Sequence, residues 1–387
     1  MSDNRLSSID LSPDSGGPCD VLFVAGEHSG DEQAARMLKA AIAENPSLRA
    51  CAFGGKALES AGAKLLFDMT AYSVVGLFEV LKNYSFFAEL SDRVVRWIKN
   101  NKPRAVCFVD YPGFNLRIAD RLRREGVSLK GGGNIKVLYY ISPQIWAWKS
   151  RRRFKIAECV DALGVIFPFE PKCYSDTGLK ADFVGHPFLD ESYVPHVRYD
   201  PKGSLLLLSG SRSAAVGRIF PVMLEVMSRF PQENAIAFYP SLAIKEQLER
   251  ILEKFPKLYG KVKLLDSSQN KVGVKAAMMS SGTMSLECSI EGIPGVIVYK
   301  ANPLTYLCGR AIVKISYLSI ANIILDAPAW REYIQFAANP NKIAQYMERV
   351  LYSPEARNEA ELNAGKLREA LKAPANMSAA EWIVKNL

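Results

Sequence analysis

The chain has 387 residues, of which 49% are hydrophobic and 23% are charged, a balance typical of a globular protein and not of a disordered one. Its 49 Lys and Arg residues outnumber its 40 Asp and Glu residues, and the formal net charge of +9 suits anionic lipids, phosphorylated ligands or an ordinary solvated surface. No run of about 18 apolar residues occurs, which argues against a membrane-spanning helix, and the length indicates two domains.

Cysteine and histidine patterns point away from a metal centre. The seven cysteines include no C-x-x-C pair, and the three histidines have no metal-ligand spacing. We therefore expect reduced, mostly buried thiols and no structural zinc. Residues 1–19 are polar and lack the apolar centre of a signal peptide, so we expect a disordered lead-in and a cytoplasmic protein.

The first half of the chain alternates short apolar runs with helical patterns. Strands are predicted at 21–25, 50–53, 105–109, 136–141, 162–166 and 181–184, and helices at 31–43, 90–100 and 116–125. Short apolar strands separated by helices are typical of a parallel sheet that is covered on both faces.

Residues 194–204 are polar and contain two prolines, which predicts a linker, and the pattern then restarts. Strands are predicted at 205–208, 235–239, 261–264, 275–279 and 295–299, with a helix at 220–229. From residue 341 onward the chain has a helical pattern that is broken near Pro354 and Pro374.

These elements predict an α/β fold with two doubly wound, Rossmann-like domains that face a cleft. We expect the first domain at 20–195, the second at 200–340, and helices at 341–387 that pack back on the first domain. In such sheets, ligands bind beyond the carboxyl ends of the strands.

The first strand leads into GEHSGD at 26–31, a glycine turn that matches neither G-x-G-x-x-G nor the Gly-Lys-Ser/Thr of phosphate loops. Ser29 is predicted to cap a helix that begins near Asp31, leaving N–H groups for a ligand, and a tight turn packed on the sheet is the alternative. Asp110 ends another strand, where a carboxylate could act as a general base or could cap the next helix.

In the second half, Ser209-Gly-Ser-Arg212 follows a strand, and its N–H groups with Arg212 could bind an anion. An ordinary strand–loop junction is the alternative. Ser281-Gly-Thr283 begins a helix whose dipole would favour a diphosphate, and Glu287, one turn further on, could accept ribose hydroxyls or belong to a capping box.

Two further stretches could contact lipid. Residues 72–87 are apolar with few charges, which predicts either a buried helix or a surface that enters a bilayer or holds an acyl chain. Trp146 and Trp148 precede the basic run 149–153, which suits phosphate or lipid head groups. Nucleic acid is not an expected partner because no known nucleic-acid module is present.

Together these motifs resemble one family, the bacterial lipid-A-disaccharide synthases, which are inverting glycosyltransferases of the GT-B fold. The resemblance runs from about residue 20 to 345 and includes GEHSGD, FGG at 53–55, VVGLFEVL at 74–81, and Asp110 to Asn115 as D-x-P-x-F-N. It continues through YYISPQIWAWK at 139–149, FPFE at 167–170, FVGHP at 183–187 and SSGTMSLE at 280–287.

The resemblance implies a metal-free, cofactor-free reaction. A 2,3-diacylglucosamine unit would pass from its UDP-activated form to 2,3-diacylglucosamine 1-phosphate, giving a lipid A disaccharide 1-phosphate and UDP. The enzyme would be cytoplasmic and peripheral on the inner face of the cytoplasmic membrane, in contact with anionic lipids. A homodimer is left open.

The resemblance also implies roles for individual residues, with Asp110 as the catalytic base. The UDP-sugar side would comprise Ser211, Arg212, Ser281, Gly282, Thr283, Glu287, Asn322, Glu332 and Gln335. The acceptor side would comprise Glu27, Ser29, Gly30, Asp31, Asn115, Ser142, Gln144 and Trp146. Membrane or acyl contacts would be Val74, Val75, Leu77, Phe78, Leu81, Phe86 and Phe87.

Some positions depart from the family pattern on the nucleotide side. Ser209, Ala321 and Arg331 replace prolines, and Ala215 replaces an acid. Because Asp110, Arg212 and Glu287 are kept, we expect an active enzyme. The alternatives are another GT-B enzyme that acts on a UDP-sugar, such as a cell-wall glycosyltransferase or a UDP-N-acetylglucosamine epimerase, and a non-catalytic membrane-associated homologue.

Overall fold

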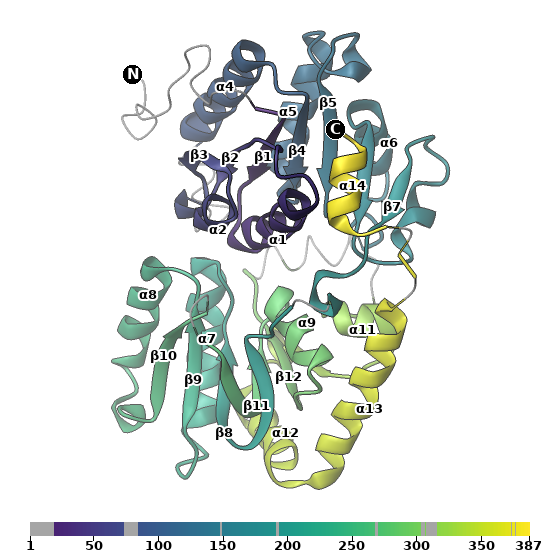
Figure 1. The fold of residues 1–387 in the computed structure, drawn as a ribbon. Helices are drawn as coiled ribbons and strands as arrows, with labels where there is room; N and C mark the ends of the chain where they lie inside the picture. The colour runs from purple at the N-terminus through teal and green to yellow at the C-terminus, as the bar shows by residue number, and fades with distance from the viewer. Residues whose placement is uncertain are drawn as a thin grey trace. The chain divides into compact units, whose positions relative to one another are not determined.

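The computed structural model describes residues 19–72, 84–147, 149–190, 193–267, 270–302, 306, 316–372, 374–375 and 377–387. The chain divides into two compact units, Met1–Pro187 together with Ala373–Leu387, and Phe188–Lys372 (Figure 1). Within the described residues, each unit is built on one parallel sheet with helices packed on it, in agreement with the predicted fold class.

The sheet of the first unit has the strand order β3-β2-β1-β4-β5-β6-β7. Its strands are β1 (Val21–Ala25), β2 (Ala50–Gly54), β3 (Lys64–Asp68), β4 (Ala105–Val109), β5 (Lys136–Tyr140), β6 (Ala162–Val165) and β7 (Ala181–Phe183). The helices are α1 (His28–Glu44), α2 (Lys56–Ser60), α4 (Tyr84–Asn101), α5 (Pro112–Arg124), α6 (Arg152–Cys159) and α14 (Ala379–Lys385). The short 3₁₀ segment η4 (Glu170–Tyr174) lies between β6 and β7.

Strand β1 shows why the sequence predicts this sheet well. All its residues are fully buried, and alternate side chains enter different cores. Leu22 and Val24 join a core that includes residues of α4, α5 and α6, whereas Val21 and Phe23 join a second core with residues of α1 and α14. A strand covered on both faces is apolar along its whole length.

The sheet of the second unit has the order β10-β9-β8-β11-β12-β13. Its strands are β8 (Val197–Leu208), β9 (Ala235–Tyr239), β10 (Val262–Asp266), β11 (Val272–Met279), β12 (Gly295–Tyr299) and β13 (Arg331–Ile334). The helices are α7 (Ser213–Met227), α8 (Leu242–Leu252), α9 (Thr283–Ile290), α11 (Ile320–Leu325), α12 (Pro340–Tyr352) and α13 (Pro354–Leu371).

The predicted linker at 194–204 is wrong over most of its length. Strand β8 begins at Val197, which pairs with Val272 of β11, and the ladder resumes at Ser204 after a register shift. Gly203 allows the close approach of these strands, because a Cβ atom there would lie 2.4 Å from the carbonyl oxygen of Gly273. Backbone pairing does not require apolar side chains, so a polar stretch in a strand resembles a linker.

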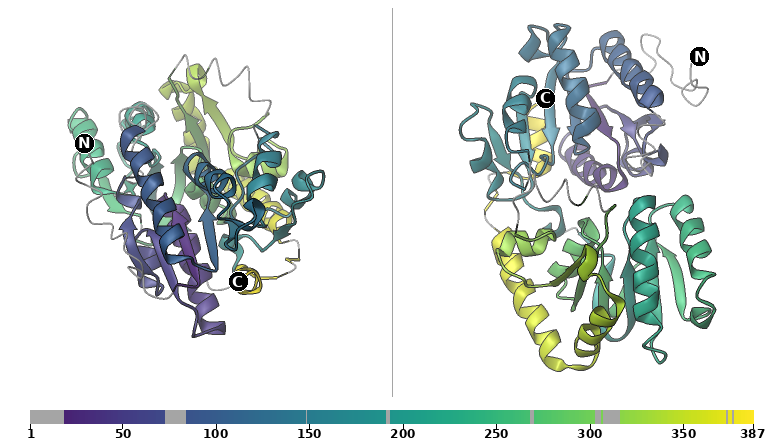
Figure 2. Two further views of the ribbon diagram at one scale, coloured as in Figure 1. Left: turned by 90° about the horizontal axis from the view of Figure 1, so that it is seen from above. Right: turned by 180° about the vertical axis from the view of Figure 1, so that it is seen from behind.

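The sequence predicts that the C-terminal helices at 341–387 all pack on the first unit. This prediction is wrong for two of them. Helix α12 contacts α7, and α13 contacts α9, so both belong to the second unit (Figure 2). Of the C-terminal helices that the structure describes, only α14 joins the first unit, where it packs against α1 and buries Trp382 completely. Among the described residues, no helix has both the length and the apolar character needed to cross a bilayer.

Candidate functional site

In the first unit, the candidate site lies where the strand order reverses. Strands β1 and β4 are neighbours, and the connections that follow them lead away to opposite sides of the sheet. Ala25 pairs with Val109, so the turn at Gly26 and the residue Asp110 leave the sheet side by side. Such a reversal opens a binding position at the carboxyl edge of a doubly wound sheet.

Asp110 has a strained and firmly held backbone. Its φ is 44°, and that of Tyr111 is 46°, a left-handed conformation that costs about 1–3 kcal/mol for a residue other than glycine. Its N–H donates to the carbonyl of Tyr140 at 3.0 Å, and its carbonyl accepts the hydroxyl of Tyr139 at 2.5 Å. The half-buried Asp110 side chain therefore leaves the sheet from a defined position.

The Asn115 side chain holds this turn through hydrogen bonds to backbone carbonyls. Its amide nitrogen lies 2.8 Å from the carbonyl oxygen of Asp110, 3.2 Å from that of Val109 and 3.3 Å from that of Val24. The side chain is fully buried, and its Oδ1 has no hydrogen-bond partner among the described residues. Asn115 thus joins the ends of β1 and β4, the role that its contacts support directly.

The GEHSGD turn is built differently from the prediction. Helix α1 begins at His28 with Glu27 at the N-cap position, so Ser29 lies inside the first turn and does not cap the helix. A Cβ atom at Gly26 would lie 2.4 Å from the Tyr111 ring, so the turn needs glycine there to pass that ring. Glu27 and Ser29 are half-buried, and Gly30 is buried.

Asp31 points into the protein and not toward solvent. Its carboxylate accepts hydrogen bonds from the N–H groups of Gly55 at 2.7 Å and Ala57 at 3.0 Å, at the start of α2. Burial raises the pKa of Asp31, while these N–H donors oppose that rise. The side chain therefore ties α1 to the glycine turn after β2.

Two loops follow β5 and β6 at the same edge, and side chains join them. The Ser142 hydroxyl lies 2.6 Å from the Tyr174 hydroxyl, and the Trp146 indole N–H donates to Glu170 at 3.3 Å. Gln144 is exposed. Burial raises the pKa of Glu170 to about 8, against the N–H donors of Phe167, Trp146 and Ile166, and the charge of Asp110 raises it further.

The second unit has a matching reversal between β8 and β11. Leu208 pairs with Met279, and the N–H of Ser280 donates to the carbonyl of Leu208 at 2.6 Å, so the loops before α7 and α9 are adjacent. Gly210 has a φ of 103°, and Ser211, Arg212 and Thr283 are exposed, while Ser281 and Gly282 are half-buried. Two helix N-termini and a guanidinium at one edge favour an anion.

The contacts of Glu287 differ from both sequence predictions, which were a ribose contact and a capping box. It is 1% exposed, and its carboxylate accepts hydrogen bonds from the N–H groups of His196 at 2.5 Å and Val197 at 3.3 Å. The ring of His196 lies 3.1 Å from its other oxygen. The reciprocal cap of α9 is instead made by Ser285 with Gly282, so Glu287 anchors the start of β8.

Asn322, Glu332 and Gln335 also bind backbone. Glu332 accepts the N–H groups of Leu318 and Ser319 at 2.8–3.0 Å, and Asn322 donates to Glu332 at 2.9 Å. Gln335, with a φ of 55°, exchanges two hydrogen bonds with Ala301. These side chains fix the backbone after β12 and before α11.

Most predicted lipid-contact residues, namely Val74, Val75, Leu77, Phe78 and Leu81, lie outside the described residues. Phe86 is only 2% exposed and belongs to the core, so its predicted lipid contact is corrected. Phe87 is half-buried, with its ring centroid 5.3 Å from that of Phe86. Within the described part of the chain, no three His, Cys, Asp or Glu side chains gather as a metal site.

Comparison with known proteins decides the family. The family model described as lipid-A-disaccharide synthetase matches residues 21–387. The chain belongs to this family. It is 31% identical over 363 residues to lipid-A-disaccharide synthase 1 of Legionella pneumophila, covering 91% of this chain and 93% of that protein. It is 34% identical over 384 residues to the lipid-A-disaccharide synthase of Nitrosococcus oceani, covering 95% and 96%.

Solved structures support the fold of this lipid-A-disaccharide synthetase family member. A putative UDP-N-acetylglucosamine 2-epimerase from Listeria monocytogenes aligns with a TM-score of 0.58 at 11% identity, covering 95% of this chain and 94% of that one. The calicheamicin glycosyltransferase aligns with a TM-score of 0.53 at 11% identity, covering 95% and 98%. The expected GT-B fold is confirmed, and the family is one of glycosyltransferases.

Proposed function

We propose that this family member transfers 2,3-diacylglucosamine from its UDP-activated form to 2,3-diacylglucosamine 1-phosphate. The observation that most supports this is Asp110, a carboxylate presented at the strand reversal on a backbone held by Tyr139, Tyr140 and Asn115. A general base must be held in position before it can remove a proton from a bound hydroxyl.

In the proposed reaction, Asp110 takes the proton of the acceptor 6-hydroxyl. The oxygen then attacks the anomeric carbon of the donor from the face opposite UDP, forming the new C–O bond as the bond to the diphosphate breaks. The configuration inverts, the proton stays on Asp110, and UDP leaves with its negative charge.

The second unit would bind the UDP part of the donor. Arg212 and the N–H groups at the starts of α7 and α9 would stabilise the departing diphosphate. Asn322, Glu332 and Gln335 would contribute by fixing the backbone around the donor, which their contacts with Leu318, Ser319 and Ala301 support. Glu287 would shape the ribose position through the residues that it anchors.

The first unit would bind the acceptor and contact the inner face of the cytoplasmic membrane. Lys149 and Arg151 are exposed beside the loop after β5, where they suit anionic head groups. If Lys149 and Arg151 contact anionic head groups, the double variant Lys149→Ser/Arg151→Ser should co-sediment less with anionic vesicles than the wild type. Undiminished sedimentation would contradict it.

Incubation of the purified protein with both lipid substrates tests the reaction. The expected result is an acceptor-dependent release of UDP and one disaccharide 1-phosphate per UDP. Consumption of the UDP-sugar in the absence of acceptor would instead indicate an epimerase or a hydrolase. Binding of both lipids without any product would indicate a non-catalytic homologue.

A further inference from the structure

The loops after β5 and β6 carry an aromatic cluster formed by Trp146, Phe167 and Phe169. The Phe167 and Phe169 rings are parallel, with centroids 5.6 Å apart and an interplanar angle of 7°. The Trp146 ring stands perpendicular to both, at 5.8 Å from Phe167 and 5.4 Å from Phe169. Edge-to-face pairs of this kind favour one arrangement of the three rings.

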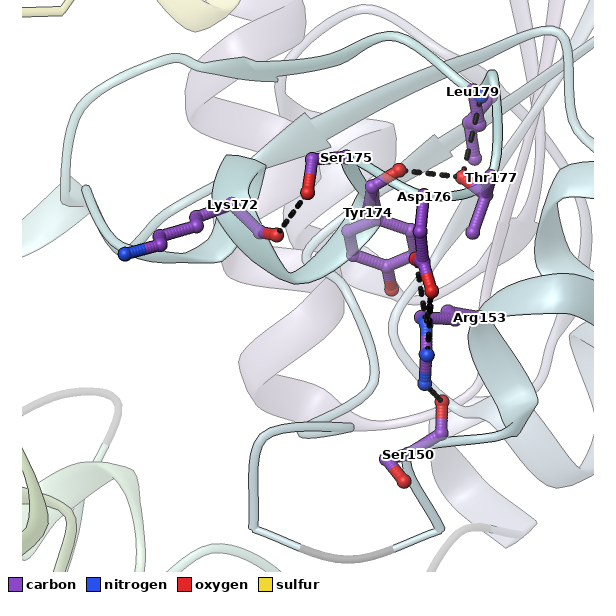
Figure 3. Close-up of polar contacts among 8 residues, drawn as sticks. All are labelled: Ser150, Arg153, Lys172, Tyr174, Ser175, Asp176, Thr177 and Leu179. Atoms are coloured by element: carbon purple, nitrogen blue, oxygen red, sulfur yellow. Dashed lines mark hydrogen bonds and ion pairs between the residues drawn. The ribbon is translucent and has the colours of Figure 1, made fainter.

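Polar contacts also join the segments that follow β5 and β6. Ser142 contacts Tyr174, and Trp146 donates to Glu170, as described above. Arg153 at the start of α6 forms a two-pronged ion pair with Asp176, with Nε 2.8 Å from Oδ1 and Nη2 2.6 Å from Oδ2 (Figure 3). The loops are therefore fastened to each other at several points and can hold the rings in place.

The cluster lies at the edge of the sheet where Asp110 lies. Strand β5 pairs with β4, and the N–H of Asp110 donates to Tyr140, the last residue of β5. Strand β6 pairs with β5 in turn, so the loops after β4, β5 and β6 all leave the same edge. The influence of the Asp110 charge on Glu170 is consistent with this proximity.

The exposure of the rings is graded. Phe167 is buried at 4% exposure, Trp146 is half-buried, and Phe169 is 36% exposed. The inner ring therefore supports two rings that reach solvent. Aromatic faces carry partial negative charge and attract groups with partial positive charge, such as the C–H face of a pyranose ring.

We propose that Trp146 and Phe169 form a stacking subsite for the acceptor sugar ring, and that Glu170 is the positioning residue that orients the Trp146 indole. This inference rests on the proposed function, because it concerns the acceptor of that reaction. It adds Phe169 and Glu170 to the residues expected from the sequence and assigns them to the sugar and not to its acyl chains.

Glu170 is suited to this role because its hydrogen-bond partners among the described residues are N–H donors. One oxygen accepts the N–H groups of Ile166 and Phe167 at 3.2 and 3.0 Å, and the other accepts the indole N–H of Trp146. In a Glu170→Gln variant, the amide oxygen can keep the two backbone bonds. Its NH₂ group would then oppose the indole N–H, so the variant removes the link that the ionised Glu170 carboxylate makes to Trp146.

The experiment compares Glu170→Gln, Trp146→Phe and the double variant in mixed micelles, with kcat and both KM values measured. Each single variant should raise the KM for diacylglucosamine 1-phosphate about 5–20-fold, with less than about twofold change in the KM for the UDP-sugar. The double variant should match Trp146→Phe alone, because Trp146→Phe has already removed the indole N–H that Glu170 holds.

A second pair of variants guards against a folding defect. Phe169→Leu keeps an apolar side chain at an exposed position and should raise the acceptor KM several-fold. Phe154→Leu is the matched control, because Phe154 is also an exposed ring, at 43%, but lies on α6 under the Arg153 guanidinium. It should leave both KM values unchanged.

The activity of the wild type tests the proposed function, and the activities of the variants test the stacking subsite. If the wild type makes no disaccharide, the proposed function fails. If the wild type is active, three results would overturn the subsite: effects of Glu170→Gln and Trp146→Phe that multiply, a selective rise in the donor KM, or altered vesicle binding with an unchanged acceptor KM. The last would assign the rings to the bilayer.

Discussion

The two strand reversals differ in how their backbones are built. At the reversal in the first unit, Asp110 and Tyr111 both have left-handed φ values although neither is glycine. At the reversal in the second unit, the left-handed position is taken by Gly210 without such strain. Strain stored around an acid suits a reacting group, whereas a relaxed loop of small residues suits an anion that must enter and leave.

The largest expected effect comes from a substitution of Asp110, the proposed catalytic base at the reversal in the first unit. Asp110→Asn keeps the shape of the side chain and the backbone bonds to Tyr139 and Tyr140 but cannot accept a proton as a carboxylate does. We expect kcat to fall about 10²–10⁴-fold, with acceptor and UDP affinities within about threefold of the wild type. Steady-state kinetics and direct UDP binding measure these quantities, and full turnover by the variant would refute the base assignment.

An intermediate effect is expected from a substitution at the reversal in the second unit, which should weaken anion binding there without changing the first unit. Arg212→Ala should weaken UDP binding about 10–100-fold while acceptor binding stays constant. Arg218→Ala is the matched control, because Arg218 is an exposed arginine within α7 that donates to the helix carbonyl of Ala214. Calorimetric titration with UDP distinguishes the two, and equal losses would show a general charge effect.

A further prediction concerns the pH dependence of stability. Because the folded-state pKa of Glu170 is raised to about 8 from 4.5, its protonated form is favoured by folding. That contribution is complete below pH 4.5 and is lost as pH rises toward 8. Among the described residues, Asp110, Cys173 and Tyr174 are ionisable groups that interact with it.

Denaturant unfolding at pH 5, 6.5 and 8 tests this. The wild type should lose more unfolding free energy across the series than Glu170→Gln, which has no proton to lose at this position. A parallel decline in both proteins would show that other groups control the dependence.

The sheets could be predicted from sequence wherever strands are buried on both faces. Strands β1, β4, β9 and β12 have the bounds that their apolar runs predict. The edge strands β3 and β13 were not predicted, because Lys64–Asp68 and Arg331–Ile334 contain exposed polar residues. The helix at 242–252 was missed as well.

The site was less predictable, because motifs identify residues without showing what they touch. Asp110 is where a strand end predicts it, but Asp31, Glu287 and Glu332 turned out to bind backbone N–H groups. The partners of Glu287 are about 90 residues away in the sequence, so no local pattern could reveal them. Glu170 is visible in the sequence only as part of the FPFE motif, and that motif does not reveal the burial that raises its pKa to about 8.

The placement of α14 has a consequence for how the protein is made. Trp382 and Ile383 complete the core over α1, and the Trp382 ring lies 6.3 Å from that of Tyr140. During synthesis, the ribosome must therefore finish the whole second unit before the first can close its core. Until then, the nascent first unit exposes an apolar surface that a chaperone could bind. The contact between α1 and α14 joins residues that are far apart in the sequence, and such contacts slow folding.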